Sequence, residues 1–410
     1  KTVLIPSGKR ELSEGNITTD LVEFGQSKGV KVLEVRTIDE AIDAMMGRKS
    51  QKPAIHLQVN PEYTDIMKNV SLHLCERARK LERQYMAESG EKNEFLDAAQ
   101  KSLDQASRAA QMGDHYSAAS FCFRAAINYD YLYQDHKNLS KQEIEVAAYK
   151  LKQSVNKFSE YLGAKKLLTL TELQAYMIVE ERLSEAQETI EEIYKTNSSA
   201  SYMLASATER VESAVVWSKF FMMGGAKYQV DNTTLAQSCE DKIRESEERY
   251  QYLQVYIPKQ FEEIKKEIEQ AGNDMYEGKY EMCLTKASKA KAEADRLINL
   301  LGTDEDQIHG LLENKLAVAK QSIYKSEQKG VFPILGYSYY EFANSLKGTD
   351  PLAAMLYAEY SLEFSNLDMY FSQGSSIDDG SVLPWSWEYI PWIVGGIILG
   401  MMTVGTREQH

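Results

Sequence analysis

The sequence is poor in the residues that build metal and redox sites. Its 410 residues include only 4 Cys and 6 His. No Cys-x-x-Cys or His-Glu-x-x-His occurs, so the usual spacings of a zinc or redox site are missing. The phosphate-binding patterns Gly-x-Gly-x-x-Gly and Gly-x-x-x-x-Gly-Lys are missing as well. We therefore predict neither a cofactor nor a metal site.

Candidate catalytic side chains are equally scarce. Acidic clusters such as Glu180-Glu181 and Glu188–Glu192 follow the spacing of solvated helix faces with lysine partners. No two histidines lie four residues apart on a helix, so we interpret all of them as solvated or capping residues: His56, His73, His115, His136, His309 and His410. The sequence thus offers no catalytic residue of its own.

Helix breakers are few, and basic residues are outnumbered by acidic ones. The chain has 8 Pro, 23 Gly and a formal net charge of −14. This acidic balance argues against nucleic acid as a partner, because nucleic acid requires a basic face. Abundant Ala, Glu, Lys and Leu predict a mainly α-helical protein.

The longest stretch without charge is residues 389–406. At 1.5 Å per residue, its ~18 residues span about 27 Å, close to the hydrocarbon thickness of a bilayer. An aromatic cluster at its N-terminal end resembles an interfacial belt: Trp385, Trp387, Tyr389 and Trp392. We predict one transmembrane helix, reached through a polar tether at 372–388.

The flanks of this stretch predict its orientation. Arg407 follows it directly and marks the cytoplasmic side, so the C-terminus is expected inside and the bulk of the chain outside the cytoplasm. Gly396 and Gly400 form a Gly-x-x-x-Gly pattern, which favours close packing of a second helix and a homo-oligomer. Glycine is also common in membrane helices without such packing.

Residues 1–48 have a different pattern from the rest of the chain. Apolar runs at 2–6 and 31–35 are typical of strands, and helical patterns follow at 17–28 and 37–46. This order predicts a parallel strand–helix–strand–helix unit. Parallel sheets are buried on both faces, and so short a unit cannot supply that cover. Because the chain begins with Lys1 rather than Met, we expect the N-terminal portion of the same precursor, or else a separate chain, to complete the sheet.

Three stretches in this unit carry a family resemblance: Lys1-Thr-Val-Leu-Ile-Pro6, Gly29-Val-Lys-Val-Leu-Glu-Val35 and Thr37-Ile-Asp-Glu-Ala41. Their order and spacing resemble the end of the Lon-type serine protease domain. With a helical region and a C-terminal membrane helix, the whole is similar to archaeal membrane-anchored relatives of Lon. The resemblance implies a Ser–Lys dyad with the lysine as general base, upstream of the matched segment. Lys1 does not correspond to that lysine, so no catalytic residue is implied in this chain.

A linker at 49–61 precedes a helical domain at 62–371. Turns at Gly113, Gly278 and Gly348 join Ala-rich helices, as in tetratricopeptide-like hairpins. A plain bundle of antiparallel helices is the alternative. The expected helices cover 61–88, 91–112, 115–135, 140–162, 169–196, 199–223, 231–256, 258–276, 279–301, 304–329, 333–346 and 351–371.

The cysteines and the sequons bear on location. If the chain lies outside the cytoplasm, disulfides are permitted, and proximity in sequence favours Cys75–Cys122 and Cys239–Cys283. Four buried thiols are the alternative. Five Asn-x-Ser/Thr sequons fit the same location, at Asn16, Asn69, Asn138, Asn197 and Asn232.

Two hypotheses of function follow. The first is the C-terminal part of a membrane-anchored, extracytoplasmic Lon-like serine peptidase, whose helical domain positions the peptidase or binds peptide or unfolded-protein clients. The alternative is a non-catalytic cell-surface scaffold or assembly subunit that uses a Lon-like remnant for docking. A Ser and a Lys in the Lon-type arrangement upstream of Lys1 would favour the first.

Overall fold

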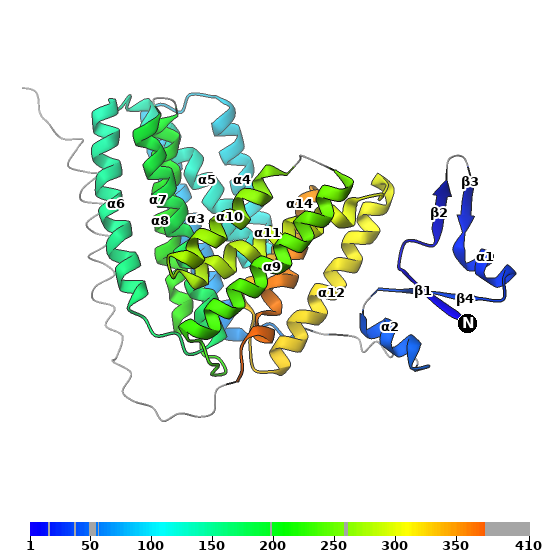
Figure 1. The fold of residues 1–410 in the computed structure, drawn as a ribbon. Helices are drawn as coiled ribbons and strands as arrows, with labels where there is room; N and C mark the ends of the chain where they lie inside the picture. Colours follow the sequence, from blue (N-terminus) through cyan, green and yellow to red (C-terminus); the bar gives the residue numbers. More distant parts are fainter. Residues whose placement is uncertain are drawn as a thin grey trace, which may run out of the picture.

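The computed structural model describes residues 1–14, 17–36, 38–48, 55, 57–196, 199–257 and 261–373. In this part of the chain the protein is mainly helical, with a small β/α unit at its N-terminal end (Figure 1). We call residues 1–48 the N-terminal unit and residues 61–373 the helical body. The coarse prediction, a mainly helical protein with a small N-terminal α/β piece, is confirmed for the described residues.

The N-terminal unit contains a parallel strand pair and an antiparallel hairpin. Strand β1 (Thr2–Pro6) pairs in parallel with β4 (Lys31–Val35), so that Leu4 lies opposite Leu33. Strands β2 (Glu11–Glu14) and β3 (Ile17–Asp20) form the hairpin. Helix α1 (Leu21–Ser27) follows β3, and α2 (Ile38–Met45) follows β4.

Two details of the predicted unit are wrong. No strand was expected between residues 6 and 17, where β2 lies, and the helix expected from residue 17 begins only at Leu21. The β-branched residues at 17–19 favour extended backbone, so they continue the hairpin as β3. Asp20 then caps α1, because its side chain accepts hydrogen bonds from the N–H groups of Val22 and Glu23.

The helical body contains twelve α-helices within its described residues, and the predicted boundaries agree with theirs to within a few residues. They are α3 Pro61–Glu88, α4 Glu94–Met112, α5 His115–His136, α6 Lys141–Gly163, α7 Leu170–Lys195, α8 Ala200–Trp217, α9 Asn232–Tyr256, α10 Glu262–Tyr276, α11 Tyr280–Leu300, α12 Ile308–Gln328, α13 Ile334–Leu346 and α14 Pro351–Ser365. Short 3-10 turns follow α8 and α14, where the predicted helices ran on, and a third precedes α12: η1 Ser218–Met222, η3 Leu367–Tyr370 and η2 Glu305–Gln307.

Local sequence explains where these helices begin and end. Asn60 accepts hydrogen bonds from the N–H groups of Glu62 and Tyr63, with Pro61 in the first turn of α3. Ser140 and Thr169 open α6 and α7 through capping boxes with the glutamate three residues on. Gly113 ends α4 in the left-handed region, at φ 84°.

The core of the body joins helices that are distant in sequence. The ring of Phe220 lies 5.6 Å from that of Tyr63 on α3 and 5.1 Å from that of Trp217 on α8. Tyr63 also contacts Phe332, just before α13, with 4.9 Å between ring centroids. This aromatic centre is fully buried and anchors the first helices of the body to the last ones.

The predicted membrane segment lies outside the described residues, together with Gly396 and Gly400. In the part of the chain that is described, no helix combines the length and the apolar character needed to cross a bilayer. Of the predicted tether, only Ser372 and Gln373 are described. They lie against the body, where the Gln229 N–H donates to the Ser372 carbonyl at 2.9 Å.

Candidate docking surface of the N-terminal unit

The parallel sheet of the N-terminal unit has two open edges. Within the described residues it consists of β1 and β4 alone. The Ser7 N–H donates to the Val35 carbonyl at 2.9 Å, so odd-numbered residues of β1 face β4. Because alternate residues of a strand point their N–H groups in opposite directions, the N–H of Leu4 points to the outer edge. Open strand edges of this kind recruit further strands.

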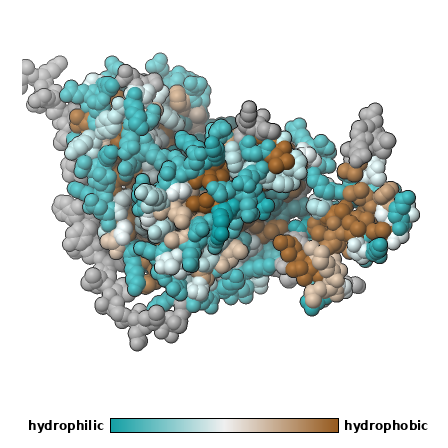
Figure 2. Space-filling view, in the orientation of Figure 1, coloured by the Kyte–Doolittle hydropathy of each residue, from teal (hydrophilic) through white to brown (hydrophobic). Residues whose placement is uncertain are grey.

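The unit exposes apolar side chains instead of burying them. Ile38 and Met45 of α2 are 79% and 77% exposed, and Phe24 of α1 is 53% exposed. Gly25 is the only buried residue among those of the unit whose burial is described. Figure 2 shows apolar residues gathered over this unit, whereas the same face of the helical body is mostly hydrophilic. Exposed apolar patches of this kind are typical of interaction sites.

One face of the parallel sheet is covered by α1. A Cβ atom on Gly25 would lie 2.4 Å from Cγ2 of Val32 and 2.9 Å from the carbonyl oxygen of Val30. Only glycine therefore lets α1 lie this close to β4. The opposite face carries a hollow of about 620 Å³, lined by Leu33, Val35 and residues of α2. Helix α2 borders this hollow, so it covers the second face only in part, whereas parallel sheets are buried on both faces.

We call the open edges of β1 and β4 and the exposed side chains of Val3, Phe24, Ile38, Ile42 and Met45 the docking surface. The surface belongs to a unit with defined local structure. Asp20 accepts hydrogen bonds from the Val22 N–H at 2.8 Å and from Arg10 Nε at 2.7 Å, which links β3, α1 and the start of the hairpin. Hydrogen bonding from the backbone of Glu23 is the main cause that lowers the pKa of the Asp20 carboxyl.

The histidines are dispersed over the described residues. His73, His136 and His309 are exposed, and His115 lies partly buried in the first turn of α5. His56 and His410 lie outside the described residues. In the ranges that are described, no three His, Cys, Asp or Glu side chains are placed to hold a metal ion.

Two disulfides join helices of the body. Cys75 on α3 is bonded to Cys122 on α5, with Cα atoms 4.9 Å apart, and Cys239 on α9 to Cys283 on α11, with Cα atoms 5.7 Å apart. This is the pairing that proximity in sequence favours. Each bond closes a three-helix unit, with α4 between the first pair and α10 between the second.

The sequons differ in accessibility. Asn138 and Asn232 are exposed beside helix ends. Asn69 is exposed on α3, but the hydroxyl-bearing residue of its sequon, Ser71, is buried. Asn16 and Asn197 lie outside the described residues.

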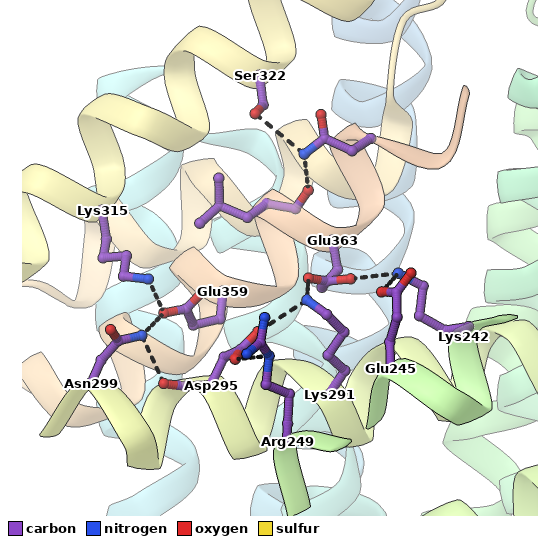
Figure 3. A network of polar contacts seen from close by, with 12 residues as sticks. Lys242, Glu245, Arg249, Lys291, Asp295, Asn299, Lys315, Ser322, Glu359 and Glu363 are labelled. Carbon is purple, nitrogen blue, oxygen red and sulfur yellow. Dashed lines mark hydrogen bonds and ion pairs between the residues drawn. The ribbon is translucent and has the colours of Figure 1, made fainter. Parts of the chain in front are cut away.

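Sequence reasoning missed a buried ion network in the second half of the body (Figure 3). Lys242 of α9 is 3% exposed and pairs with Glu363 of α14 at 2.9 Å. Glu359, one turn earlier on α14, pairs with Lys315 of α12 at 2.7 Å and accepts a hydrogen bond from Asn299 of α11 at 2.9 Å. The network connects four helices, and its members satisfy one another's charges.

The interpretation of the acidic clusters as solvated faces is wrong in part. Glu181 of α7 forms a largely buried ion pair with Lys289 of α11. The four-residue spacing of Glu359 and Glu363 was the available signal for the network. Such spacing does not distinguish a solvated stripe from a stripe paired with another helix.

Comparisons with known proteins do not add a family. No family model, no curated protein and no solved structure gives a significant match to the chain.

Proposed function

We propose that the N-terminal unit completes a Lon-like serine peptidase domain, whose Ser–Lys dyad lies in a segment packed on the docking surface. The open parallel sheet carries this proposal. Among the residues of the unit whose burial is described, only Gly25 is buried, so these residues form no core of their own. The resemblance of residues 1–48 to the end of a Lon-type domain gives the identity of the missing strands. The proposed occupant is the N-terminal portion of the same precursor.

The helical body then positions the peptidase above a membrane. Its buried aromatic centre and two disulfides make it a rigid platform, and disulfides persist outside the cytoplasm. The proposed anchor is a single transmembrane helix at 389–406 with a cytoplasmic C-terminus. Hairpins of the tetratricopeptide-like kind in the body would present peptide or unfolded-protein clients to the peptidase.

The experiment that tests the peptidase proposal uses two matched double variants. Ile38→Glu with Met45→Glu charges the docking surface, and Val255→Glu with Met369→Glu charges two positions of the body that are 75% and 70% exposed. Each tagged full chain is produced with the N-terminal portion of the precursor and purified under native conditions. A serine-reactive fluorophosphonate and an unstructured fluorogenic peptide then report the dyad and its activity.

We expect wild type and the body variant to retain the N-terminal portion, a labelled serine and peptide cleavage. The docking variant should lose at least about tenfold in association, because each buried charge costs more than ~1.4 kcal/mol. Equal retention by both variants would overturn the proposal. A retained partner without a labelled serine would establish the scaffold function instead.

The membrane proposal has its own test. The full chain and a variant lacking residues 389–406 are produced in cells, and the membranes are washed at alkaline pH. The full chain should stay in the pellet and the truncated chain should be released. Release of both chains would contradict a spanning helix.

A further inference from the structure

A second concave site lies in the helical body, away from the docking surface. It is a cavity of about 280 Å³ between α3, α5, α7, α8, α13 and α14. Its walls contain two arginines, Arg124 and Arg182, and no carboxylate. In a chain with a formal net charge of −14, a cavity of this composition is electrostatically distinct from its surroundings.

Arg182 is held rigidly at the wall of this cavity. Its Nε donates to Ser213 Oγ at 2.9 Å, and its Nη1 donates to the Ile178 carbonyl at 3.1 Å. The guanidinium lies over the Trp217 ring, 5.0 Å from the centroid. Nη2 has no hydrogen-bond partner among the described residues. The side chain is therefore oriented by three contacts and keeps donors for a ligand.

Three more donors in the cavity lack an acceptor within the described residues. Arg124 is exposed, and its guanidinium carbon lies 5.6 Å from the centroid of the Phe121 ring. It has no ion-pair partner among the described residues. Tyr116 and Tyr357 line the same cavity, and the hydroxyl group of neither makes a hydrogen bond within the described residues. A ligand that satisfies this set must offer several acceptor oxygens, and a carboxylate does so against guanidinium groups.

The remaining walls are mainly apolar, and several of their aromatic rings pack against one another. Tyr116 meets Trp217 edge-on at 5.8 Å between centroids, and Phe342 meets Tyr357 edge-on at 4.6 Å. Tyr116, Trp217 and Phe342 are buried, so the walls are preformed. The volume of about 280 Å³ is close to the lower limit for ligand cavities, which is about 300 Å³. The cavity therefore accommodates one group of the size of a side chain.

The geometry points to a binding site for a carboxylate carried on one apolar or aromatic group. Arg182 and Arg124 hold the carboxylate, Tyr116 and Tyr357 donate to its oxygens, and Trp217 and Phe342 contact the apolar group. The C-terminal residue of a peptide and a free small acid share this chemistry. The site does not depend on the proposed peptidase, because every residue in it belongs to the helical body.

Calorimetric titration of the full chain tests the ligand chemistry. The probes are N-acetylphenylalanine and its C-terminal amide, which differ only in the carboxylate. The acid should bind with a dissociation constant below about 1 mM, and the amide should bind at least about tenfold more weakly. Equal binding of both probes, or no binding of the acid, overturns the inference. A tetrapeptide ending in phenylalanine, tested as the acid and as the amide, then identifies the source of the carboxylate. If the tetrapeptide acid binds, the site takes peptide C-termini. If N-acetylphenylalanine binds and the tetrapeptide acid does not, the site takes small free acids.

Three variants test the residues. Arg124→Gln removes an exposed charge and Tyr357→Phe removes one hydroxyl, so both should leave the fold unchanged. We expect the first to weaken binding of the acid about tenfold and the second several-fold, with little change in binding of the amide. Arg108→Gln, at an exposed position of α4, is the matched control and should bind as wild type does. Unchanged binding of the acid by Arg124→Gln and Tyr357→Phe would contradict the assignment.

Discussion

The two regions of this chain solve the burial problem in opposite ways. The helical body encloses large side chains completely, as at Phe220, which is 0% exposed, and Trp217, which is 2% exposed. The N-terminal unit leaves Phe24 53% exposed and Ile38 79% exposed. Both regions have well-formed secondary structure, so the difference lies in packing and not in local propensity.

The comparison shows that helical hairpins and parallel strands differ in self-sufficiency. A helix satisfies its own backbone and needs an apolar neighbour on one stripe, which the next helix along the chain provides. A parallel strand pair needs neighbours at both edges and cover on both faces. Among the described residues, the N-terminal unit places α1 on one face and α2 over part of the other, and the edges of β1 and β4 stay unpaired.

The largest expected effect comes from removing a buried aromatic side chain of the body, compared with an exposed one of the N-terminal unit. Phe220→Ala should lower the free energy of unfolding by about 3–5 kcal/mol, because it opens a cavity in the buried aromatic centre. Phe24→Ala in the chain alone should change it by less than about 0.5 kcal/mol. Urea unfolding followed by circular dichroism measures both. If both variants lost a similar free energy of unfolding, the two regions would not differ in packing as described.

The disulfides give the next largest effect, again confined to the helical body. The bond between Cys75 and Cys122 closes a loop with a sequence separation of 47. Replacing both residues by alanine should cost roughly 2–4 kcal/mol, because the unfolded chain regains the freedom that the bond removes. Urea midpoints of the double variant and of wild type, with and without reductant, measure the cost. Reductant should lower the urea midpoint of the double variant less than that of wild type, because the variant lacks one of the two bonds. If the double variant unfolds at the same urea concentration as wild type, this disulfide does not stabilise the body.

The pKa of a carboxyl group is shifted in opposite directions in the two regions. Burial, with repulsion from Asp114 as a smaller cause, raises the pKa of Glu341 to about 8 from its ordinary 4.5. In the N-terminal unit, hydrogen bonds from the backbone lower the pKa of Asp20. Glu341 accepts from the Tyr116 N–H at 2.7 Å, so it caps the start of α5 from α13.

This contrast predicts a pH dependence. Between pH 4.5 and about 8, folded Glu341 keeps a proton that the unfolded chain has released, so stability falls as the pH rises through this window. In Glu341→Gln, whose amide oxygen still accepts the same N–H, that loss should shrink by at least about 1.4 kcal/mol, the equivalent of one pKa unit. Urea unfolding at pH 5 and pH 8.5 measures the change. Parallel losses in wild type and variant would contradict the assigned pKa.

The sequence predicted elements whose determinants are local. The caps at Asn60, Ser140 and Thr169 define helix starts within a few residues, and the two apolar runs of the N-terminal unit define its parallel strands. The hairpin of β2 and β3 was missed because its strands are short and its β-branched residues stand directly before a helix. The missed features of the body depend on contacts between distant segments.

The cavity with Arg124 and Arg182 illustrates this limit. Its residues come from helices spread over most of the body, and no spacing in the sequence relates Arg182 on α7 to Arg124 on α5. The docking surface could be anticipated because an incomplete parallel sheet follows from the strand order alone. Its side chains could not, because the choice between exposed and buried depends on where α1 and α2 pack.

The smallest expected effect isolates the N-terminal unit from the body. Gly25→Ala would place a Cβ atom 2.4 Å from Cγ2 of Val32 and 2.9 Å from the Val30 carbonyl oxygen, so α1 must move away from β4. We expect a loss on the order of 1 kcal/mol in local stability, seen as faster hydrogen exchange in β1 and β4, while the urea midpoint of the body stays unchanged. Gly29→Ala is the matched control: it meets no atom within 4 Å, but its φ of 66° adds backbone strain without displacing α1. Faster exchange throughout α3 to α14 in Gly25→Ala would show that the two regions unfold together, and the distinction between a self-sufficient body and a dependent unit would then fail.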